Sequence, residues 1–226
     1  MYLKGFAKMD GFLHRYYLNN SNKDLYKWFH YFDIYERHFE RFRGKSPLVL
    51  EIGVSKGGSL GMWKEYFGPG CRILGIDNDP KCATLGDRTI SVRIGEQQDA
   101  AFLGRVLGEF GRPDIVIDDG SHMMSHVTET FSALYPAISP NGVYLVEDMH
   151  TAYLPDYEGG VGKPGTFIEL CKGLIDEMNA LYTNGEVPVT PFTTGTDSMT
   201  FYDSVVVFEK RPQGKRQNCT TGPMAG

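Results

Sequence analysis

The sequence lacks the features that mark several large classes of protein. Its 226 residues include only four cysteines, which are widely separated and form no CxxC pair: Cys71, Cys82, Cys171 and Cys219. This spacing predicts neither a zinc knuckle nor a disulfide framework, so we expect reduced thiols. No apolar run approaches the roughly 20 residues that cross a bilayer, and the first residues lack the apolar core of a signal peptide. We therefore expect a soluble, cytoplasmic protein that does not insert into a membrane.

The sequence also lacks a strong charge of one sign. The formal net charge is −5, and no sustained run of Lys or Arg occurs along the chain. A surface for nucleic acid or for anionic lipid needs such a concentration of positive charge, so we expect neither partner. The chain does have a hydrophobic content of 41% over a length that suits one well-packed domain with an appendage.

Aromatic residues crowd the first 45 positions. Residues 24–43 are predicted to form a helix, because apolar side chains recur there every three or four positions. This stripe contains Leu25, Trp28, Phe32, Tyr35, Phe39 and Phe42. Two interpretations stay open. The stripe packs on the following domain or on another subunit of a homo-oligomer, or some of its rings, with His30, roof a substrate site, where flat apolar faces suit a sugar ring.

A strand, a glycine-rich turn and a helix follow in this order. Leu48–Ile52 is a short apolar run, Gly53–Ser59 contains the glycines, and a helical pattern passes through Trp63. This order opens a nucleotide-binding α/β fold, where the chain must approach a ligand without side chains in the way. The turn departs from G-x-G-x-x-G, and an ordinary tight turn would also explain its glycines.

The next two strands end on polar residues that suit an adenosine ligand. Arg72–Asp77 ends on a carboxylate that can accept both ribose hydroxyls of adenosylmethionine, NAD or FAD, although Asp77 can also simply cap the turn after it. Thr89–Ile94 leads into Gln97 and Asp99, which can bind an adenine edge. Asp99 serves equally well as the N-cap of the next helix.

Two further apolar runs each end on paired acids. Ile115–Ile117 is followed by Asp118 and Asp119 and then by a Gly-Ser-His segment, and Val143–Val146 is followed by Glu147 and Asp148. In a parallel α/β sheet the carboxyl ends of the strands line the ligand crevice. Asp119, Glu147 and Asp148 can therefore share one hard cation, with His122 beside it.

Other interpretations of these residues stay open. Asp118 either binds the cofactor or orients the loop, and acids at strand ends often only cap helices. His122 and His126 are four residues apart, which is a conceivable spacing for a zinc pair. His150 and Tyr153 either line a substrate pocket or belong to the core.

The order of these elements predicts an α/β fold with a doubly wound, Rossmann-like sheet of seven mostly parallel strands. Residues 199–202 and 205–209 supply an antiparallel C-terminal hairpin. We divide the chain into an aromatic-rich helical segment over residues 1–45, a cofactor-binding domain over residues 46–210 and a disordered tail over residues 211–226.

Three motifs resemble a known family. The Glu-x-Gly-x-Ser-x-Gly pattern at residues 51–57 resembles the first motif of class I S-adenosylmethionine (SAM) methyltransferases. Residues 117–122 (IDDGSH) and 146–151 (VEDMHT) resemble the macrolide-sugar O-methyltransferases and the related group of rhamnosyl O-methyltransferases and cephalosporin hydroxylases. The likeness covers roughly residues 28–210.

The resemblance implies the class I methyltransferase fold and a metal-dependent O-methyltransferase. The acceptor would be a sugar hydroxyl of a glycosylated natural product or a surface glycan. Asp119, Glu147 and Asp148 would bind Mg²⁺ or another divalent ion such as Mn²⁺, and His122 would be the general base, with Asp119 beside it in the catalytic group. The cofactor-binding residues would be Glu51, Gly53, Ser55, Gly57, Ser59, Asp77, Gln97, Asp99 and Asp118.

Two other functions remain in view. The hydroxylase group raises the possibility of a non-catalytic SAM-binding subunit that supports a partner enzyme. A nicotinamide-dependent dehydrogenase has the same kind of fold, but the missing G-x-G-x-x-G turn and the C-terminal hairpin disfavour it.

Overall fold

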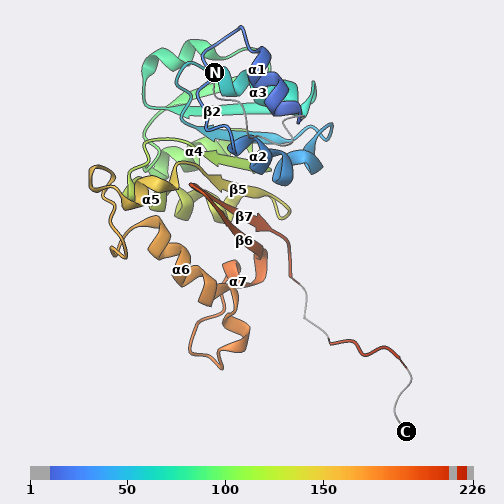
Figure 1. Cartoon of the computed structure of the whole chain (residues 1–226), viewed down its shortest axis with the longest axis vertical. Helices are drawn as coiled ribbons and strands as arrows, with labels where there is room; N and C mark the ends of the chain where they lie inside the picture. The colour runs from blue at the N-terminus through green and yellow to red at the C-terminus, as the bar shows by residue number, and fades with distance from the viewer. Residues whose placement is uncertain (1–10, 214–217, 223–226) are drawn as a thin grey trace, which may run out of the picture.

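In the computed structural model, which describes residues 11–213 and 218–222, seven strands form one sheet in the order β3-β2-β1-β4-β5-β7-β6 (Figure 1). Strands β1 to β5 are parallel, and β7 runs antiparallel between β5 and β6. The strands are β1 (Leu48–Ile52), β2 (Arg72–Asp77), β3 (Ile90–Ile94), β4 (Ile115–Asp118), β5 (Val143–Val146), β6 (Thr196–Tyr202) and β7 (Val205–Lys210). The predicted mostly parallel sheet with an antiparallel C-terminal hairpin is confirmed.

Helices cover both faces of this sheet. The α-helices are α1 (Phe12–Asn19), α2 (Tyr31–Phe39), α3 (Gly58–Phe67), α4 (Ala100–Phe110), α5 (Met124–Leu134), α6 (Phe167–Met178) and α7 (Pro191–Gly195). Short 3₁₀ segments are η1 (Glu40–Phe42), η2 (Pro80–Leu85), η3 (Tyr135–Ala137), η4 (Met149–Tyr153), η5 (Pro155–Tyr157) and η6 (Ala180–Tyr182). Helices α6 and α7 lie together beside β6 and β7 (Figure 1).

Strand side chains alternate between two cores. In β5, Val143 and Leu145 join the core under α1, α2 and α3, whereas Tyr144 and Val146 join the core under α4, α5 and α6. Because both faces are covered, the strands have nearly continuous apolar sequences. Each large apolar side chain that is fully buried contributes roughly 1.5–3 kcal/mol to folding.

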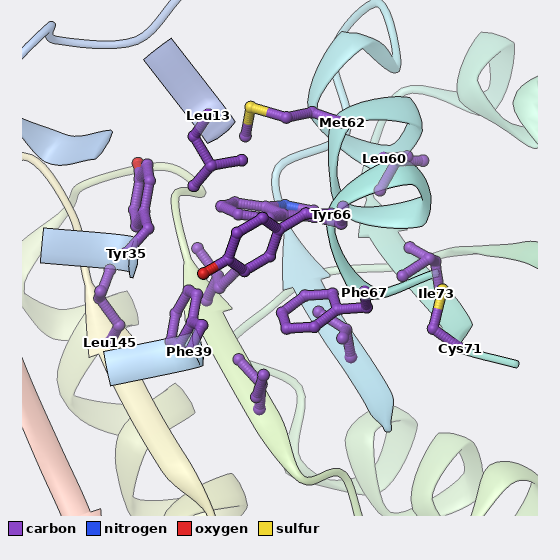
Figure 2. Close-up of a cluster of buried hydrophobic side chains, with 14 of the residues drawn as sticks. Leu13, Tyr35, Phe39, Leu60, Met62, Tyr66, Phe67, Cys71, Ile73 and Leu145 are labelled. Carbon is purple, nitrogen blue, oxygen red and sulfur yellow. The ribbon is translucent and has the colours of Figure 1, made fainter. Parts of the chain in front are cut away.

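The aromatic segment before β1 belongs largely to the first of these cores. Figure 2 shows Phe39 from α2 beside Phe67 from α3, and Tyr35, also from α2, packs edge-on against Trp63 at 5.0 Å between ring centroids. Phe32, Tyr35 and Phe39 are fully buried. Because these rings pack against other residues of the same chain, they do not support the predicted homo-oligomer, which stays a prediction.

The helix predicted over residues 24–43 is shorter than expected. It is helical only from Tyr31 to Phe39, with one 3₁₀ turn after it, while residues 24–28 have no regular structure. The irregular segment passes close to the start of α3. The backbone oxygen of Asp24 lies so near Gly58 that a Cβ at Gly58 would approach it to 2.2 Å. Trp28, predicted to be on the buried stripe, is 48% exposed.

The first and last predicted segments are described only in part. Residues 1–10, 214–217 and 223–226 lie outside the described residues. At the start of the predicted tail, the backbone N–H groups of Arg211 and Gln213 donate to Gly195 and Thr194, both at 2.9 Å. Within the described part of the chain, no helix has the length and apolar character needed to cross a membrane.

Candidate active site

A cavity of about 400 Å³ lies at the carboxyl ends of the parallel strands, where an open α/β sheet binds its ligands. The turn after β1 and the irregular segment before α2 form two of its walls. The other walls come from Asp77 at the end of β2 and from the residues that follow β4 and β5. A smaller cavity of about 220 Å³ shares Gly53, Asp77 and Gly120 with the first and adds residues 95–98. The two cavities are adjoining parts of one site.

Gly53 and Gly57, in the turn after β1, have left-handed backbone conformations, and Gly53 also lies against the backbone of a neighbouring loop. Gly53 has φ +90°, and a Cβ there would lie 1.9 Å from the carbonyl oxygen of Asp119. Gly57 has φ +75° and is the N-cap of α3. Ser55, which lines the cavity, has a positive φ of 50° without being glycine. The turn after β1 therefore contacts the loop after β4. As a result, the predicted cofactor-binding residues of this turn lie next to Asp119.

Asp77 lies on the wall shared by the two cavities. Its Oδ2 accepts hydrogen bonds from the backbone N–H groups of Val54 at 2.8 Å and Ser55 at 3.0 Å, and Oδ1 accepts one from Asp79 at 2.8 Å. Burial raises the pKa of Asp77, but these backbone bonds outweigh burial and hold the pKa below its usual value. The carboxylate caps its turn and still presents negative charge to the cavity.

Four of the predicted cofactor residues line neither cavity: Glu51, Gly57, Asp99 and Asp118. Glu51 is fully buried in β1 and accepts a hydrogen bond from the hydroxyl of Ser59, which does line the cavity, at 2.8 Å. Asp118 is also buried, and it accepts a hydrogen bond from the amide of Gln97 at 3.1 Å. Gln97 lines the smaller cavity, whereas Asp99 caps α4 by accepting from two backbone N–H groups at 2.9 and 3.0 Å.

A group of possible metal ligands stands at the other end of the larger cavity. One ligand atom each from Asp119, His122 and Asp148 lies within 4.8 Å of the others. His122 Nε2 is 3.9 Å from Asp119 Oδ1 and 3.6 Å from Asp148 Oδ2. His122 and Asp148 have φ of +59° and +53°, a left-handed conformation that costs about 1–3 kcal/mol in a non-glycine residue and is typical of functional sites.

Lys27 is the site residue that sequence reasoning missed. Its ammonium is almost fully buried and donates to Asp119 Oδ2 at 2.5 Å and to the two oxygens of Glu147 at 3.0 and 2.9 Å. Glu147, which we predicted to be a metal ligand, lines the same cavity, contacts Lys27 and accepts a hydrogen bond from the Tyr35 hydroxyl at 2.7 Å. The only available signal was a lysine inside an otherwise aromatic-rich stretch.

Acidic side chains outnumber basic ones around this ammonium, because Glu51 also lies 3.6 Å from Lys27. Burial, followed by the charge of Asp119, raises the pKa of Glu147 to about 8, and burial raises the pKa of Glu51 to about 7. Burial lowers the pKa of Lys27, but the three surrounding acids hold it well above its usual value. A further cation in the cavity would favour the ionised forms of these acids.

The remaining candidate residues lie at the edges of the site. His126 hydrogen-bonds Ser121 at 2.9 Å beside the smaller cavity. His150 hydrogen-bonds the Ser204 hydroxyl at 2.6 Å and packs edge-on against Trp28 at 5.9 Å between ring centroids. Tyr153 is 50% exposed. Trp28 is partly exposed and lines the same cavity as Asp119, His122 and Asp148.

No protein-family model matches the chain. The sequences of several individual proteins are similar to it. The chain is 41% identical over 177 residues to the 8-demethyl-8-(2-methoxy-alpha-L-rhamnosyl)-tetracenomycin-C 3'-O-methyltransferase of Streptomyces olivaceus, which covers 74% of this chain and 44% of that protein. It is 42% identical over 168 residues to the mycinamicin VI 2''-O-methyltransferase of Micromonospora griseorubida, covering 70% of this chain and 40% of that protein.

Solved structures agree with this similarity. The MycE methyltransferase from the mycinamycin biosynthetic pathway, in complex with Mg and SAH, matches with a TM-score of 0.76 at 35% identity, over 95% of this chain and 56% of that chain. A MycE structure that also contains mycinamycin VI matches with a TM-score of 0.73 at 36% identity, over 84% of this chain and 52% of that chain. The chain thus spans about half the length of the relatives it matches.

Proposed function

We propose that this chain, which is related to the class I SAM-dependent O-methyltransferases of macrolide and tetracenomycin sugars, methylates a sugar hydroxyl of a glycosylated natural product. One observation carries the proposal. The same cavity is walled by the glycine turn with Asp77 and by Asp119, His122 and Asp148. A methyl donor and a site that can activate a hydroxyl would therefore adjoin each other.

The cofactor fits the part of the site built from β1, β2 and β3. Asp77 suits the two ribose hydroxyls of SAM, and Gln97 lines the smaller cavity, which suits the adenine. Gly53 lines both cavities and presents no side chain to a ligand there. Residues 46–210 would thus form the SAM-binding domain, with residues 24–31 as a wall of the same site.

The residues present also fit a divalent ion, for which Mg²⁺ is our proposal. Asp119 and Asp148 offer the hard oxygen ligands that Mg²⁺ prefers, and three acids face the single ammonium of Lys27 beside them. A bound ion would supply Lewis-acid stabilisation to a hydroxyl that loses its proton. Glu147 lines the same cavity, and its Oε2 accepts a hydrogen bond from Lys27 alone, so we keep Glu147 with Asp119 and Asp148 as a proposed ligand of the ion.

We assign His122 as the base that takes the proton. It lines the cavity, and its Nε2 lies 3.6 Å from Asp148 Oδ2 and 3.9 Å from Asp119 Oδ1, beside the proposed ion. The acceptor oxygen then forms a bond to the methyl carbon of SAM while the carbon–sulfur bond breaks, and S-adenosylhomocysteine leaves. The proton of the hydroxyl ends on His122.

The rim of the cavity suits a sugar acceptor. The half-exposed ring of Trp28 and its neighbour His150 offer a flat apolar face with polar groups beside it, next to His122 and Asp148. Two relatives are named for methylation of sugar-bearing compounds, and one MycE structure contains mycinamycin VI. We extend that acceptor class to this chain.

Two measurements test the proposal. Calorimetric titration with S-adenosylhomocysteine and with NAD should show binding of the first and none of the second; the reverse would favour a dehydrogenase. A panel of glycosylated acceptors with labelled SAM, read by mass spectrometry, should then yield a methylated product that depends on His122. Cofactor binding with no product from any acceptor would favour the non-catalytic subunit.

A further inference from the structure

We propose that His150 is a specificity-determining residue whose Nε2 donates a hydrogen bond to an oxygen of the acceptor sugar, and that Ser204 is the positioning residue that fixes its ring for this contact. This role rests on the proposed function, since it concerns the acceptor of that reaction. A sugar differs from an apolar ligand by its oxygens. A fixed N–H donor beside an aromatic face would therefore select for a sugar.

Ser204 lies in the two-residue turn between β6 and β7, at a place that the sheet fixes. Tyr202 and Val205 pair across the two strands on either side of the turn, and Val205 is fully buried. Ser204 has φ +64°, a left-handed conformation of the kind that tight turns use. Its carbonyl oxygen also accepts a hydrogen bond from the backbone N–H of Met149 at 2.8 Å. The hydroxyl of Ser204 is therefore held in one place beside His150.

The hydroxyl of Ser204 determines which ring nitrogen of His150 carries the hydrogen. The backbone N–H of His150 donates to Ser204 Oγ at 3.2 Å, and the ring Nδ1 lies 2.6 Å from the same oxygen. Within the described residues, Nδ1 is the only protein acceptor for the hydroxyl proton. When the hydroxyl donates to Nδ1, the hydrogen of the neutral ring lies on Nε2. The opposite tautomer would leave the hydroxyl proton without a protein acceptor.

The Nε2 of His150 is left for a ligand. Over residues 11–213 and 218–222, this nitrogen has no hydrogen-bond partner in the protein. The imidazole is half-buried and packs edge-on against Trp28 at 5.9 Å between ring centroids. Trp28 lines the same cavity as His122. A sugar can lay its C–H face on the indole while one of its oxygens accepts the hydrogen of Nε2.

The same hairpin turn also positions Trp28. His30 follows Trp28 by two residues, and its Nε2 donates to the carbonyl oxygen of Asp203 at 3.1 Å. The rings of Trp28 and His30 contact each other edge-on at 6.1 Å between centroids. The turn thus holds both the aromatic face and the donor. Because their relative position is set before the acceptor arrives, binding loses less conformational entropy.

The first test determines the tautomer of His150 by nitrogen NMR of the isotope-labelled full chain, at a pH at which the ring is neutral. Wild type should carry the hydrogen on Nε2. Ser204→Ala and Ser204→Gly should both show a mixture of tautomers, because each removes the hydroxyl. Glycine also suits the positive φ, so a shared result excludes backbone strain as the cause. A hydrogen on Nδ1 in wild type, or no change in either variant, overturns the proposal.

Ser121→Ala is the matched control. Ser121 Oγ lies 2.9 Å from the Nδ1 of His126 and accepts a backbone N–H, that of Met123, at 3.3 Å, so its contacts are of the same kind as those of Ser204. His126 lines the smaller cavity. The variant should change the ring signals of His126 and leave those of His150 in place. An equal change at His150 in the control overturns the proposal, since the tautomer would then not depend on Ser204.

The second test adds phenyl glycosides of rhamnose, glucose and galactose. The Nε2 signal of His150 and the indole signal of Trp28 should shift together, while the signal of the fully buried Trp63 stays in place. His150→Phe keeps a ring but removes the donor, and it should raise the Kd of the glycoside about 2- to 12-fold, the usual effect of losing one hydrogen bond. A shift at Trp28 without one at His150, or an unchanged Kd in His150→Phe, overturns the proposal.

Calorimetry with S-adenosylhomocysteine separates this proposal from the proposed function. If the wild type binds it and glycosides shift Trp28 but not His150, the role of His150 fails and the proposed function stands. If it binds but no glycoside shifts either signal, the sugar acceptor and the role of His150 fail together, and the methyltransferase assignment stands. If S-adenosylhomocysteine does not bind, both proposals fail.

Discussion

Replacement of Lys27 by methionine should destabilise the fold strongly. Methionine keeps most of the apolar stem but removes the ammonium that three carboxylates surround: Asp119 at 2.5 Å, Glu147 at 2.9 Å and Glu51 at 3.6 Å. Removing one partner of a buried ion pair leaves uncompensated charge and typically costs about 3–5 kcal/mol. Such a loss is a large fraction of the roughly 5–15 kcal/mol by which domains are stable.

The measurement is the free energy of unfolding from urea denaturation at pH 7. Lys64→Met is the matched control, because Lys64 pairs with Asp87 at 2.8 Å on the surface, and exposed pairs contribute only about 0–1 kcal/mol. Adding Glu147→Gln to Lys27→Met should recover about 1–3 kcal/mol, since a glutamine is neutral without a proton, whereas buried Glu147, whose pKa is raised to about 8, must bind one on folding at pH 7. If Lys27→Met were as stable as Lys64→Met, the ammonium would not balance the buried acids.

Three other predictions follow from the site. His122→Ala should lower kcat by about 10²–10⁴-fold while S-adenosylhomocysteine binds as before, as single-turnover assays and calorimetry would show; near wild-type turnover would exclude His122 as the base. Trp28→Ala should raise KM for the acceptor roughly 2- to 12-fold, equivalent to about 0.5–1.5 kcal/mol of stacking, whereas the remote exposed Tyr182→Ala should not. Because the buried Asp118 has its pKa raised to about 7, the folded chain binds a proton that the unfolded chain releases near pH 4, so stability should fall as pH rises from about 4 to 7. Urea titrations of Asp118→Asn should show a slope smaller by up to about 1.4 kcal/mol per pH unit in that window, and an unchanged slope would mean that Asp118 is ionised in the fold.

Much of the sheet could be predicted, because its signals are local. Each parallel strand is a short, largely apolar run that ends at or just before a glycine or a polar residue, and the C-terminal hairpin has its turn at Asp203 and Ser204. The strand-end rule also placed Asp77, Asp119 and Asp148 at one edge of the sheet. All three now line the same cavity.

The contacts of individual acids were harder to predict, because neighbouring residues point in opposite directions. Asp118 and Asp119 are adjacent, yet Asp118 turns inward to Gln97 while Asp119 faces the cavity. Along a strand, successive side chains alternate between faces, which explains why Asp118, at the end of β4, and Asp119 point in different directions. The sequence shows the pair but not which member faces the ligand.

The role of Lys27 depends on contacts with residues that are far away in the sequence, and local sequence patterns do not show such contacts. Its partners Asp119 and Glu147 are 92 and 120 residues further along the chain. The same contact explains why the aromatic stripe is not one continuous helix. Residues 24–28 leave the helical path and line the cavity, which brings the ammonium to the strand ends.

The central claim is that an ion held by Asp119 and Asp148 prepares a sugar hydroxyl to take the methyl group of SAM. The most direct measurement is methyl transfer from labelled SAM to a glycosylated acceptor by enzyme stripped of metal with a chelator, before and after Mg²⁺ is restored. We predict that stripping abolishes product formation and that Mg²⁺ restores it in wild type but not in Asp148→Asn. Undiminished transfer by the stripped enzyme would contradict the claim.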